Sequence, residues 1–210
     1  MVLGLNSNME ENNDVNQSNF WENRYKKEEI GWDLGAETPV FTALSDTLDP
    51  GKVCILGCGN GYDAILFSKK GFSVTAVDFA ETPIHNLETN ARSLSLSIET
   101  IKKDIFDLTP DYSSQFDYII EQTCFCAIDP LKREQYSNLV YDLLKVGGKL
   151  IGLWMPLDKD IDEGGPPFGV KEDEIKMLFS NKWKITADYF PNQSIEARKG
   201  REKLIVFEKL

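Results

Sequence analysis

The stretch that decides the fold reads VCILGCGNGYDAILFSKKGFSVTAVD and runs from residue 53 to residue 78. Its first four residues form a short apolar run that ends in the glycine-rich turn GCGNG at 57–61, a pattern typical of a buried parallel strand entering a tight turn. Residues 62–70 are apolar at helical spacing, and Gly71 follows where helices commonly end. A second apolar run at 73–77 completes the β-α-β unit that we predict here.

Asp78 follows this second apolar run and therefore lies at the C-terminal end of a predicted parallel strand. Open α/β sheets bind ligands at that edge, and an acidic side chain there can accept hydrogen bonds from both hydroxyls of a ribose. Glycines in the preceding turn allow the backbone to approach a ligand closely. The stretch therefore predicts a nucleotide-type ligand near the glycine turn and Asp78.

The spacing of the glycines discriminates between two classes of nucleotide-type cofactor. The dinucleotide fingerprint G-x-G-x-x-G would place its last glycine at position 62, but Tyr62 stands there and the last glycine is Gly61. This spacing favours S-adenosylmethionine over a nicotinamide dinucleotide. Two alternatives remain open: an NAD-dependent oxidoreductase, and a turn whose glycines have only a structural role.

Length and charge limit the class of protein and its partners. A chain of 210 residues is the size of one domain, and its net charge of −11 repels phosphate backbones and anionic lipid. We therefore expect a small-molecule ligand and neither a nucleic-acid nor a membrane partner. No apolar run approaches the length of a membrane span, and the N-terminus has no signal-peptide pattern. We expect a cytoplasmic monomer.

Cysteine and histidine are too few and too poorly spaced for a metal site. The cysteines form no C-x-x-C pair, and His85 is the single histidine, so we predict no zinc centre. His85 falls near the start of an expected helix without a nearby partner in sequence, which predicts a surface or cap residue. The cysteines lie in apolar contexts and are expected to be free thiols in a reducing compartment: Cys54, Cys58, Cys124 and Cys126.

The N-terminal region divides into a polar tail and an aromatic helix. Residues 1–18 are rich in Asn and poor in apolar side chains, so we predict a disordered tail followed by a single domain at 19–210. Asn19 and Glu22 form an N-x-x-E pattern that predicts a helix start. The next turns place Trp21 and Tyr25 on one helical face, with Trp32 just beyond the helix. These three aromatic residues are interpreted either as core packed on the sheet or as a lid over the cofactor.

Strands and helices alternate through the rest of the chain, which predicts a parallel sheet with right-handed crossovers. The last two strands are expected to pair antiparallel. Thr82-Pro83 is the expected start of one helix, and Gly147-Gly148 the expected end of another. The expected helices cover 39–49, 82–93, 131–144 and 172–179, and the expected further strands cover 97–102, 116–120, 149–154, 183–190 and 204–208.

Six separated stretches carry a further signal: FWENRYKKEEIGWDLGAETP (20–39), LGCGNGYD (56–63), KKDIFD (102–107), CFCAIDP (124–130), GGPPFGV (164–170) and RKGREKL (198–204). With them the chain resembles the thiopurine methyltransferase family, and within it the halide/thiol methyltransferases known from plants. Glycine turns are common to many methyltransferases. The Trp-rich first stretch and GGPPFGV are specific to this family.

The resemblance implies an α/β fold of the Rossmann-like class I methyltransferase type, with a seven-stranded, mostly parallel sheet, one antiparallel late strand and helices on both faces. It implies S-adenosyl-L-methionine as the cofactor, with S-adenosyl-L-homocysteine as its product, and it favours the lid interpretation of the aromatic residues. The residues it places around the cofactor are Trp21, Tyr25, Trp32, Gly57, Gly59, Asp78, Asp104, Ile105 and Gln122. For the substrate pocket we predict Phe41, Phe125, Phe168 and Arg198.

Two positions depart from related patterns. Ile55 stands where many class I methyltransferases carry an acid, as is general in this family. Gln122 stands where halide/thiol members tend to have tyrosine and thiopurine members arginine, which leaves the acceptor open. We predict methyl transfer to a small soft nucleophile, namely a thiol, thiocyanate, halide or thiopurine-like thiol, without a protein general base. A non-catalytic cofactor-binding protein is the alternative.

Overall fold

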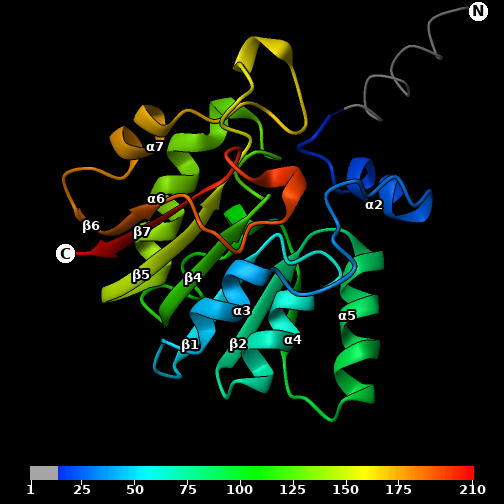
Figure 1. The fold of residues 1–210 in the computed structure, drawn as a ribbon. Helices are drawn as coiled ribbons and strands as arrows, with labels where there is room; N and C mark the ends of the chain where they lie inside the picture. Colours follow the sequence, from blue (N-terminus) through cyan, green and yellow to red (C-terminus); the bar gives the residue numbers. More distant parts are fainter. Residues whose placement is uncertain (1–13) are drawn as a thin grey trace, which may run out of the picture.

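The computed structural model describes residues 14–210, which form one sheet with helices on both faces (Figure 1). Most of the predicted tail, residues 1–13, lies outside the described residues. The sheet order is β3-β2-β1-β4-β5-β7-β6. All neighbouring pairs up to β5 are parallel, and β7 runs antiparallel to both β5 and β6. The prediction of a seven-stranded, mostly parallel sheet with one antiparallel late strand is confirmed.

The secondary-structure elements have the following bounds. The strands are β1 Lys52–Leu56, β2 Ser73–Asp78, β3 Glu99–Lys102, β4 Phe116–Gln122, β5 Leu144–Trp154, β6 Trp183–Tyr189 and β7 Lys203–Lys209. The α-helices are α2 Ser18–Lys26, α3 Pro39–Ser45, α4 Tyr62–Lys69, α5 Glu81–Ser93, α6 Arg133–Leu143 and α7 Glu172–Leu178. Short 3-10 helices are η1 Ile105–Asp107, η2 Pro130–Lys132, η3 Ile161–Glu163 and η4 Glu196–Arg198.

Two hydrophobic cores lie on opposite faces of the sheet. Successive side chains of a strand point to opposite faces, and in β1 Val53 and Ile55 join one core whereas Cys54 and Leu56 join the other. Helices α3, α4 and α5 cover the first face, and α6 and α7 cover the second (Figure 1). The central strands are apolar on both sides because both faces are covered.

The chain order reverses at β1, which places a ligand site there. Strand β1 pairs with β2 on one side and with β4 on the other. In a parallel sheet the connections after these strands then leave in opposite directions and open a crevice at the C-terminal strand ends. Leu56, Asp78 and Gln122 are the last residues of β1, β2 and β4, so the segments that follow them meet at this crevice.

Several predicted boundaries are wrong, and strand pairing explains one of them. The helix expected at 39–49 ends at Ser45, and the strand expected at 97–102 begins at Glu99. No glycine ends α6, because Leu144 directly follows it and already pairs with Phe116 of β4. Gly147, with a φ of 78°, lies inside β5 instead of capping the helix.

The predicted start of the aromatic helix is also corrected. Helix α2 begins at Ser18, and Asn19 is not its cap. Residues 14–17 form a turn before this helix, and the Val15 carbonyl accepts a hydrogen bond from the Trp21 indole nitrogen at 2.8 Å. Glu22 bonds to the start of α5, which begins at Glu81 and not at the expected Thr82-Pro83.

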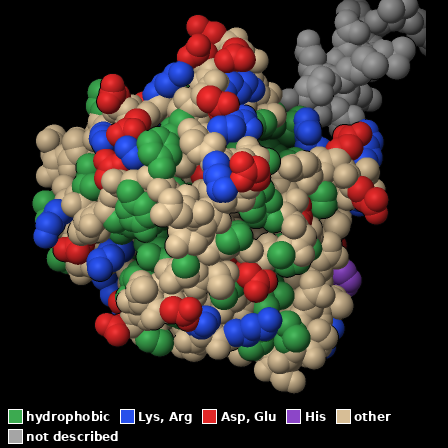
Figure 2. Space-filling view, viewed as in Figure 1, with side chains coloured by type: hydrophobic (Ala, Val, Ile, Leu, Met, Phe, Trp, Pro, Cys, Tyr) green, Lys and Arg blue, Asp and Glu red, His purple; other side chains and the backbone are tan. Residues whose placement is uncertain are grey.

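The surface carries charges of both signs. Figure 2 shows Lys and Arg side chains interspersed with Asp and Glu side chains over the face in view. Among residues 14–210, no helix combines the length and the apolar character needed to cross a membrane.

Candidate active site

A cavity of about 540 Å³ opens at the C-terminal edge of the sheet, beside the point where the strand order reverses. Its walls come from α2 and the loop after it, the glycine turn, the ends of β2 and β4, and the loops before β7. The structure brings these sequence-predicted residues together in the lining: Trp21, Tyr25, Trp32, Gly57, Gly59, Asp78, Asp104, Ile105, Gln122 and Arg198.

The glycine turn requires residues without side chains. Gly59 and Gly61 have φ values of 54° and 79°, in the left-handed region that favours glycine. A Cβ atom on Gly61 would lie 2.4 Å from the Leu87 side chain of α5, and one on Gly59 would lie 3.1 Å from the Tyr25 hydroxyl. Gly61 therefore allows the turn to pack on α5, and Gly59 keeps the backbone open toward the cavity.

Asp78 connects the end of β2 to the glycine turn. Its Oδ2 accepts the backbone N–H of Gly59 and its Oδ1 accepts that of Ala80, both at 3.0 Å. The residue is 7% exposed, and burial raises the pKa of its carboxyl to about 6, although these hydrogen bonds oppose the shift. Each oxygen retains a second lone pair, so Asp78 can still accept hydroxyl donors from the cavity side.

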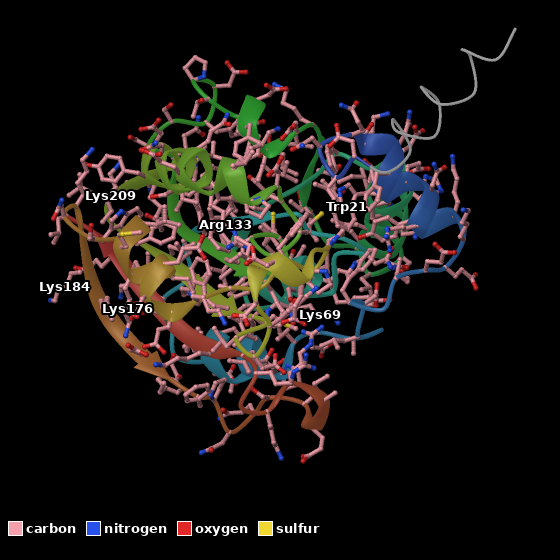
Figure 3. The ribbon with its side chains drawn as sticks, turned by 90° about the horizontal axis from the view of Figure 1, so that it is seen from above. Trp21, Lys69, Arg133, Lys176, Lys184 and Lys209 are labelled. Carbon is pink, nitrogen blue, oxygen red and sulfur yellow. The ribbon has the colours of Figure 1, made fainter. Side chains whose placement is uncertain are left out.

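Three aromatic rings form one wall of the cavity. The Trp32 ring packs edge-on against Trp21 at 5.5 Å and against Tyr25 at 5.7 Å between centroids. In Figure 3, Trp21 lies between α2 and the body of the domain. None of the three belongs to the two cores on the sheet, although Tyr25 is buried, and their position in the cavity lining favours the lid interpretation. The Trp32 carbonyl accepts a hydrogen bond from Arg198 at 2.8 Å.

The ends of β3 and β4 supply the opposite wall. The Asp104 side chain caps η1 by accepting the Phe106 N–H at 3.1 Å, which places Ile105 beside the cavity. After β4, Thr123 adopts a φ of 60°, a strained conformation for a β-branched residue. The side-chain nitrogen of Gln122 is buried and has no hydrogen-bond partner among residues 14–210, so it remains able to donate.

Three predicted substrate-pocket residues do not line the cavity. Phe41 is fully buried in α3 on the core of one face, and Phe125 is 1% exposed with its ring 5.1 Å from Trp154 in the other core. Phe168 packs on Gly165, whose added Cβ would lie 2.6 Å from the ring, and Pro166 faces the cavity instead. These predictions are corrected, because sequence proximity to the site did not specify the direction of the rings.

Sequence reasoning missed several polar residues of the lining. Asp63, at the start of α4, accepts the Thr38 backbone N–H at 2.8 Å and its hydroxyl at 2.9 Å. Burial raises the pKa of Asp63 to about 6. Asn60 donates to Asp33 at 2.6 Å. Asp63 ends the stretch LGCGNGYD and Thr38 lies near the end of the stretch at 20–39, so both residues fall in stretches that carry the family resemblance, but neither stretch indicates their pairing.

The structure also places the four cysteines and the single histidine. All four cysteines are free thiols, as predicted. Burial raises the pKa of Cys58, Cys124 and Cys126, so these cavity-lining thiols stay protonated near neutral pH. His85 is exposed and lines a separate shallow hollow on α5, which confirms the prediction of a surface residue.

Comparison with known proteins identifies the family. The sequence profile of Thiopurine S-methyltransferase (TPMT) matches residues 16–208. The chain belongs to the thiopurine S-methyltransferase family. It is 31% identical over 194 residues to the probable thiol methyltransferase 2 of Arabidopsis thaliana, with 90% of this chain and 84% of that protein covered. It is 29% identical over 185 residues to the thiopurine S-methyltransferase of Aliivibrio fischeri strain MJ11, covering 80% and 84%.

Solved structures support the fold of this family member. A 1,6-didemethyltoxoflavin-N1-methyltransferase of Burkholderia thailandensis, with bound 1,6-didemethyltoxoflavin and S-adenosylhomocysteine, aligns with a TM-score of 0.72 at 18% identity over 91% of this chain and 86% of that one. The PH0226 protein of Pyrococcus horikoshii OT3 aligns with a TM-score of 0.68 at 20% identity, covering 94% of both chains. The class I methyltransferase fold is therefore confirmed.

The family member is an S-adenosylmethionine-dependent methyltransferase, and its cavity fits that cofactor. Asp78 offers free lone pairs to hydroxyl donors, and a side chain on Gly59 would meet Tyr25 and fill the open space. The cavity volume of about 540 Å³ lies in the range of sites for molecules of that size. The glycine turn lacks the spacing of the dinucleotide motif, and the family to which the chain belongs consists of methyltransferases, so nothing supports the NAD-dependent alternative.

Proposed function

We propose that this methyltransferase acts on a small soft nucleophile: a thiol, thiocyanate, a halide or a thiopurine-like thiol. The observation that carries the proposal is the enclosure of the cavity by Trp21, Tyr25 and Trp32, with the single histidine outside it. The names of the relatives are consistent with it, since they include thiol, thiocyanate and thiopurine methyltransferases.

In the proposed site each wall of the cavity contacts a different part of the cofactor. Gly57 and Gly59 allow the cofactor to approach the backbone closely, and Asp78 accepts hydrogen bonds from the ribose hydroxyls. Asp104 and Ile105 lie beside the adenine. Gln122, the last residue of β4, faces the cofactor, and the aromatic wall closes over the remaining part of the cofactor. Arg198, 6% exposed and bonded to Trp32, lies on the acceptor side.

The proposed chemistry needs alignment and water exclusion from the protein. When bound, S-adenosylmethionine supplies an activated methyl group on a sulfonium. Trp21, Tyr25 and Trp32 exclude water from the acceptor, and the faces of such rings favour a nearby cation. Attack of an anion on a sulfonium cancels charge as the transition state forms, so an apolar enclosure assists it.

No protein base is required in this proposal. Asp63 already accepts two hydrogen bonds from Thr38, and Asp78 accepts two from backbone N–H groups. Exposed His85 does not line the cavity and lies in the hollow on α5. A halide or thiolate is already ionised and has no proton to lose. The protein then contributes mainly orientation, for which about 7–11 kcal/mol is available in favourable intramolecular reactions.

A panel of methyl acceptors tests this proposal. The purified protein is mixed with methyl-labelled cofactor and one acceptor at a time. The soft acceptors are a thiol, thiocyanate, iodide and a thiopurine, and the comparison compounds are an amine and an alcohol of similar size. We expect labelled product with at least one soft acceptor and none with the amine or the alcohol. Cofactor binding by calorimetry without any product would support the non-catalytic alternative, and a preference for the amine would contradict the proposed acceptor class.

The aromatic wall is expected to act as a lid. We predict that backbone amides between Phe20 and Trp32 exchange with solvent faster in the free protein than in its complex with S-adenosylhomocysteine, because the rings lie on a cavity wall outside both sheet cores. Hydrogen-exchange mass spectrometry measures this difference, and α6, which lies in the second core, serves as the internal reference. Equal protection in both states would contradict the lid and support the interpretation of these aromatic residues as ordinary core.

A further inference from the structure

Glu22 caps a helix that lies far from it in sequence. Its Oε2 accepts the backbone N–H groups of Glu81 and Thr82, each at 2.9 Å, and its Oε1 accepts the Thr82 hydroxyl at 2.7 Å. The residue at the N-cap position of α5 is Ala80, which has no side-chain oxygen and makes no side-chain cap. Figure 1 shows α2 next to this end of α5. Glu22 therefore supplies the missing cap from another helix.

The charge of Glu22 strengthens this contact. Partial burial raises its pKa, but hydrogen bonds from the backbone and hydroxyl of Thr82 and the neighbouring Lys26 together lower the pKa to about 2. The carboxylate is thus ionised at neutral pH. An anion at the N-terminus of a helix interacts favourably with the helix dipole and with its free N–H groups. The charged groups that face this cluster are Lys26, 3.1 Å from Glu22, and Lys102, 3.2 Å from Glu81.

The contact connects two walls of the cavity. On α2, Trp21 and Tyr25 flank Glu22 in sequence and both line the cavity. On the other side, the first turn of α5 follows Asp78 closely, and the Ala80 N–H bonds to the Asp78 carboxylate. Glu22 therefore sets the position of the aromatic wall relative to the carboxylate that is proposed to hold the ribose.

We propose that Glu22 is a positioning residue for the cofactor, which holds α2 and its aromatic rings over the cavity by capping α5. The inference rests on the proposed assignment of this cavity as the cofactor site. Glu22 does not line the cavity, and its role is to place Tyr25 and Trp21 opposite Asp78.

The test compares Glu22→Ala and Glu22→Gln by calorimetry with S-adenosylhomocysteine and by steady-state kinetics. We expect Glu22→Ala to weaken binding about 10-fold, because charge-assisted hydrogen bonds to the helix end are lost. In steady-state kinetics the KM for S-adenosylmethionine should rise as well in Glu22→Ala, because the aromatic wall loses its fixed position. Glutamine keeps an acceptor oxygen for the two N–H groups, so Glu22→Gln should bind within about 3-fold of the wild type.

Two further variants serve as controls. Lys26 contacts Glu22 from the solvent side with 64% of its side chain exposed, so Lys26→Ala should leave cofactor affinity unchanged. Thr82→Val removes only the hydroxyl donor. Because Thr82 and Glu22 form one unit, the double variant Glu22→Ala/Thr82→Val should bind no more weakly than Glu22→Ala alone.

The possible outcomes separate this inference from the proposed function. If the wild type binds S-adenosylhomocysteine and Glu22→Ala binds it with the same affinity, the role proposed for Glu22 is overturned and the proposed cofactor site stays intact. Equal losses of cofactor affinity in Glu22→Ala and Glu22→Gln would also overturn it, since glutamine keeps an acceptor oxygen for the two N–H groups of α5. Failure of the wild type to bind S-adenosylhomocysteine would overturn the proposed site itself.

Discussion

Replacement of Asp78 by alanine is expected to weaken the binding of S-adenosylmethionine about 10- to 150-fold, because hydrogen bonds to a charged group contribute about 1.5–3 kcal/mol each. Asp78 is 7% exposed and both oxygens already bond to the backbone, so its remaining lone pairs have fixed directions. The ribose hydroxyls can then donate hydrogen bonds to the Asp78 carboxylate without any movement of this side chain. Calorimetry on the folded variant measures the change in affinity.

Asp78→Asn is the matched control for charge. Its carboxamide keeps one acceptor oxygen and the size of the side chain, so we expect an affinity between those of the wild type and Asp78→Ala. Circular dichroism establishes that each variant is folded before binding is compared. An unchanged affinity in a folded Asp78→Ala protein would remove Asp78 from the proposed site.

The pKa of Asp78 adds a pH dependence to the same experiment. Burial raises this pKa to about 6 in the free protein, whereas donors from a ribose favour the ionised carboxylate. Binding is therefore expected to weaken as the pH falls through about 6, approaching about tenfold per pH unit well below it. The affinity of Asp78→Asn, which has no titrating group at this position, should be much less dependent on pH. Asp63, with a similar pKa, is unchanged in both proteins and provides the common background.

The second large effect is expected in the pH dependence of the methyl acceptor. With a thiol, the rate at saturating cofactor should rise about tenfold per pH unit below the pKa of that thiol, because the thiolate is the reacting form. Iodide has no proton to lose, so its rate should be nearly flat between about pH 7.5 and 9, where the cavity carboxylates are ionised. The two profiles, measured on one protein preparation, isolate the titration of the acceptor.

His85→Ala is the corresponding variant test of a base-free mechanism. His85 is exposed in a hollow outside the main cavity, so we expect nearly full turnover with both acceptors. A large loss of turnover in a folded His85→Ala protein would contradict the mechanism. An iodide rate that follows an enzyme group titrating between about pH 7.5 and 9 would contradict it as well.

The strand-turn-helix unit around Gly59 and Asp78 could be predicted because its requirements are local. An apolar run, glycines at left-handed positions and an acid at a strand end specify the turn with little help from the rest of the chain. The parallel character of the sheet followed from the alternation of strands and helices, whereas its seven-stranded class I form came from the family resemblance. Trp21, Tyr25 and Trp32 came from the family resemblance, and the structure places them in the cavity lining.

Side-chain direction and contacts between distant segments were decided only by the tertiary structure. Phe41 and Phe125 lie close in sequence to cavity segments, yet their helix and loop turn both rings into the cores, where apolar burial is most favourable. Glu22 fits a local capping pattern with Asn19, but its carboxylate bonds to α5, because packing brings unpaired N–H groups and a helix dipole within its reach. Local sequence specifies backbone turns, whereas a partner about 60 residues away exists only once the helices have packed together.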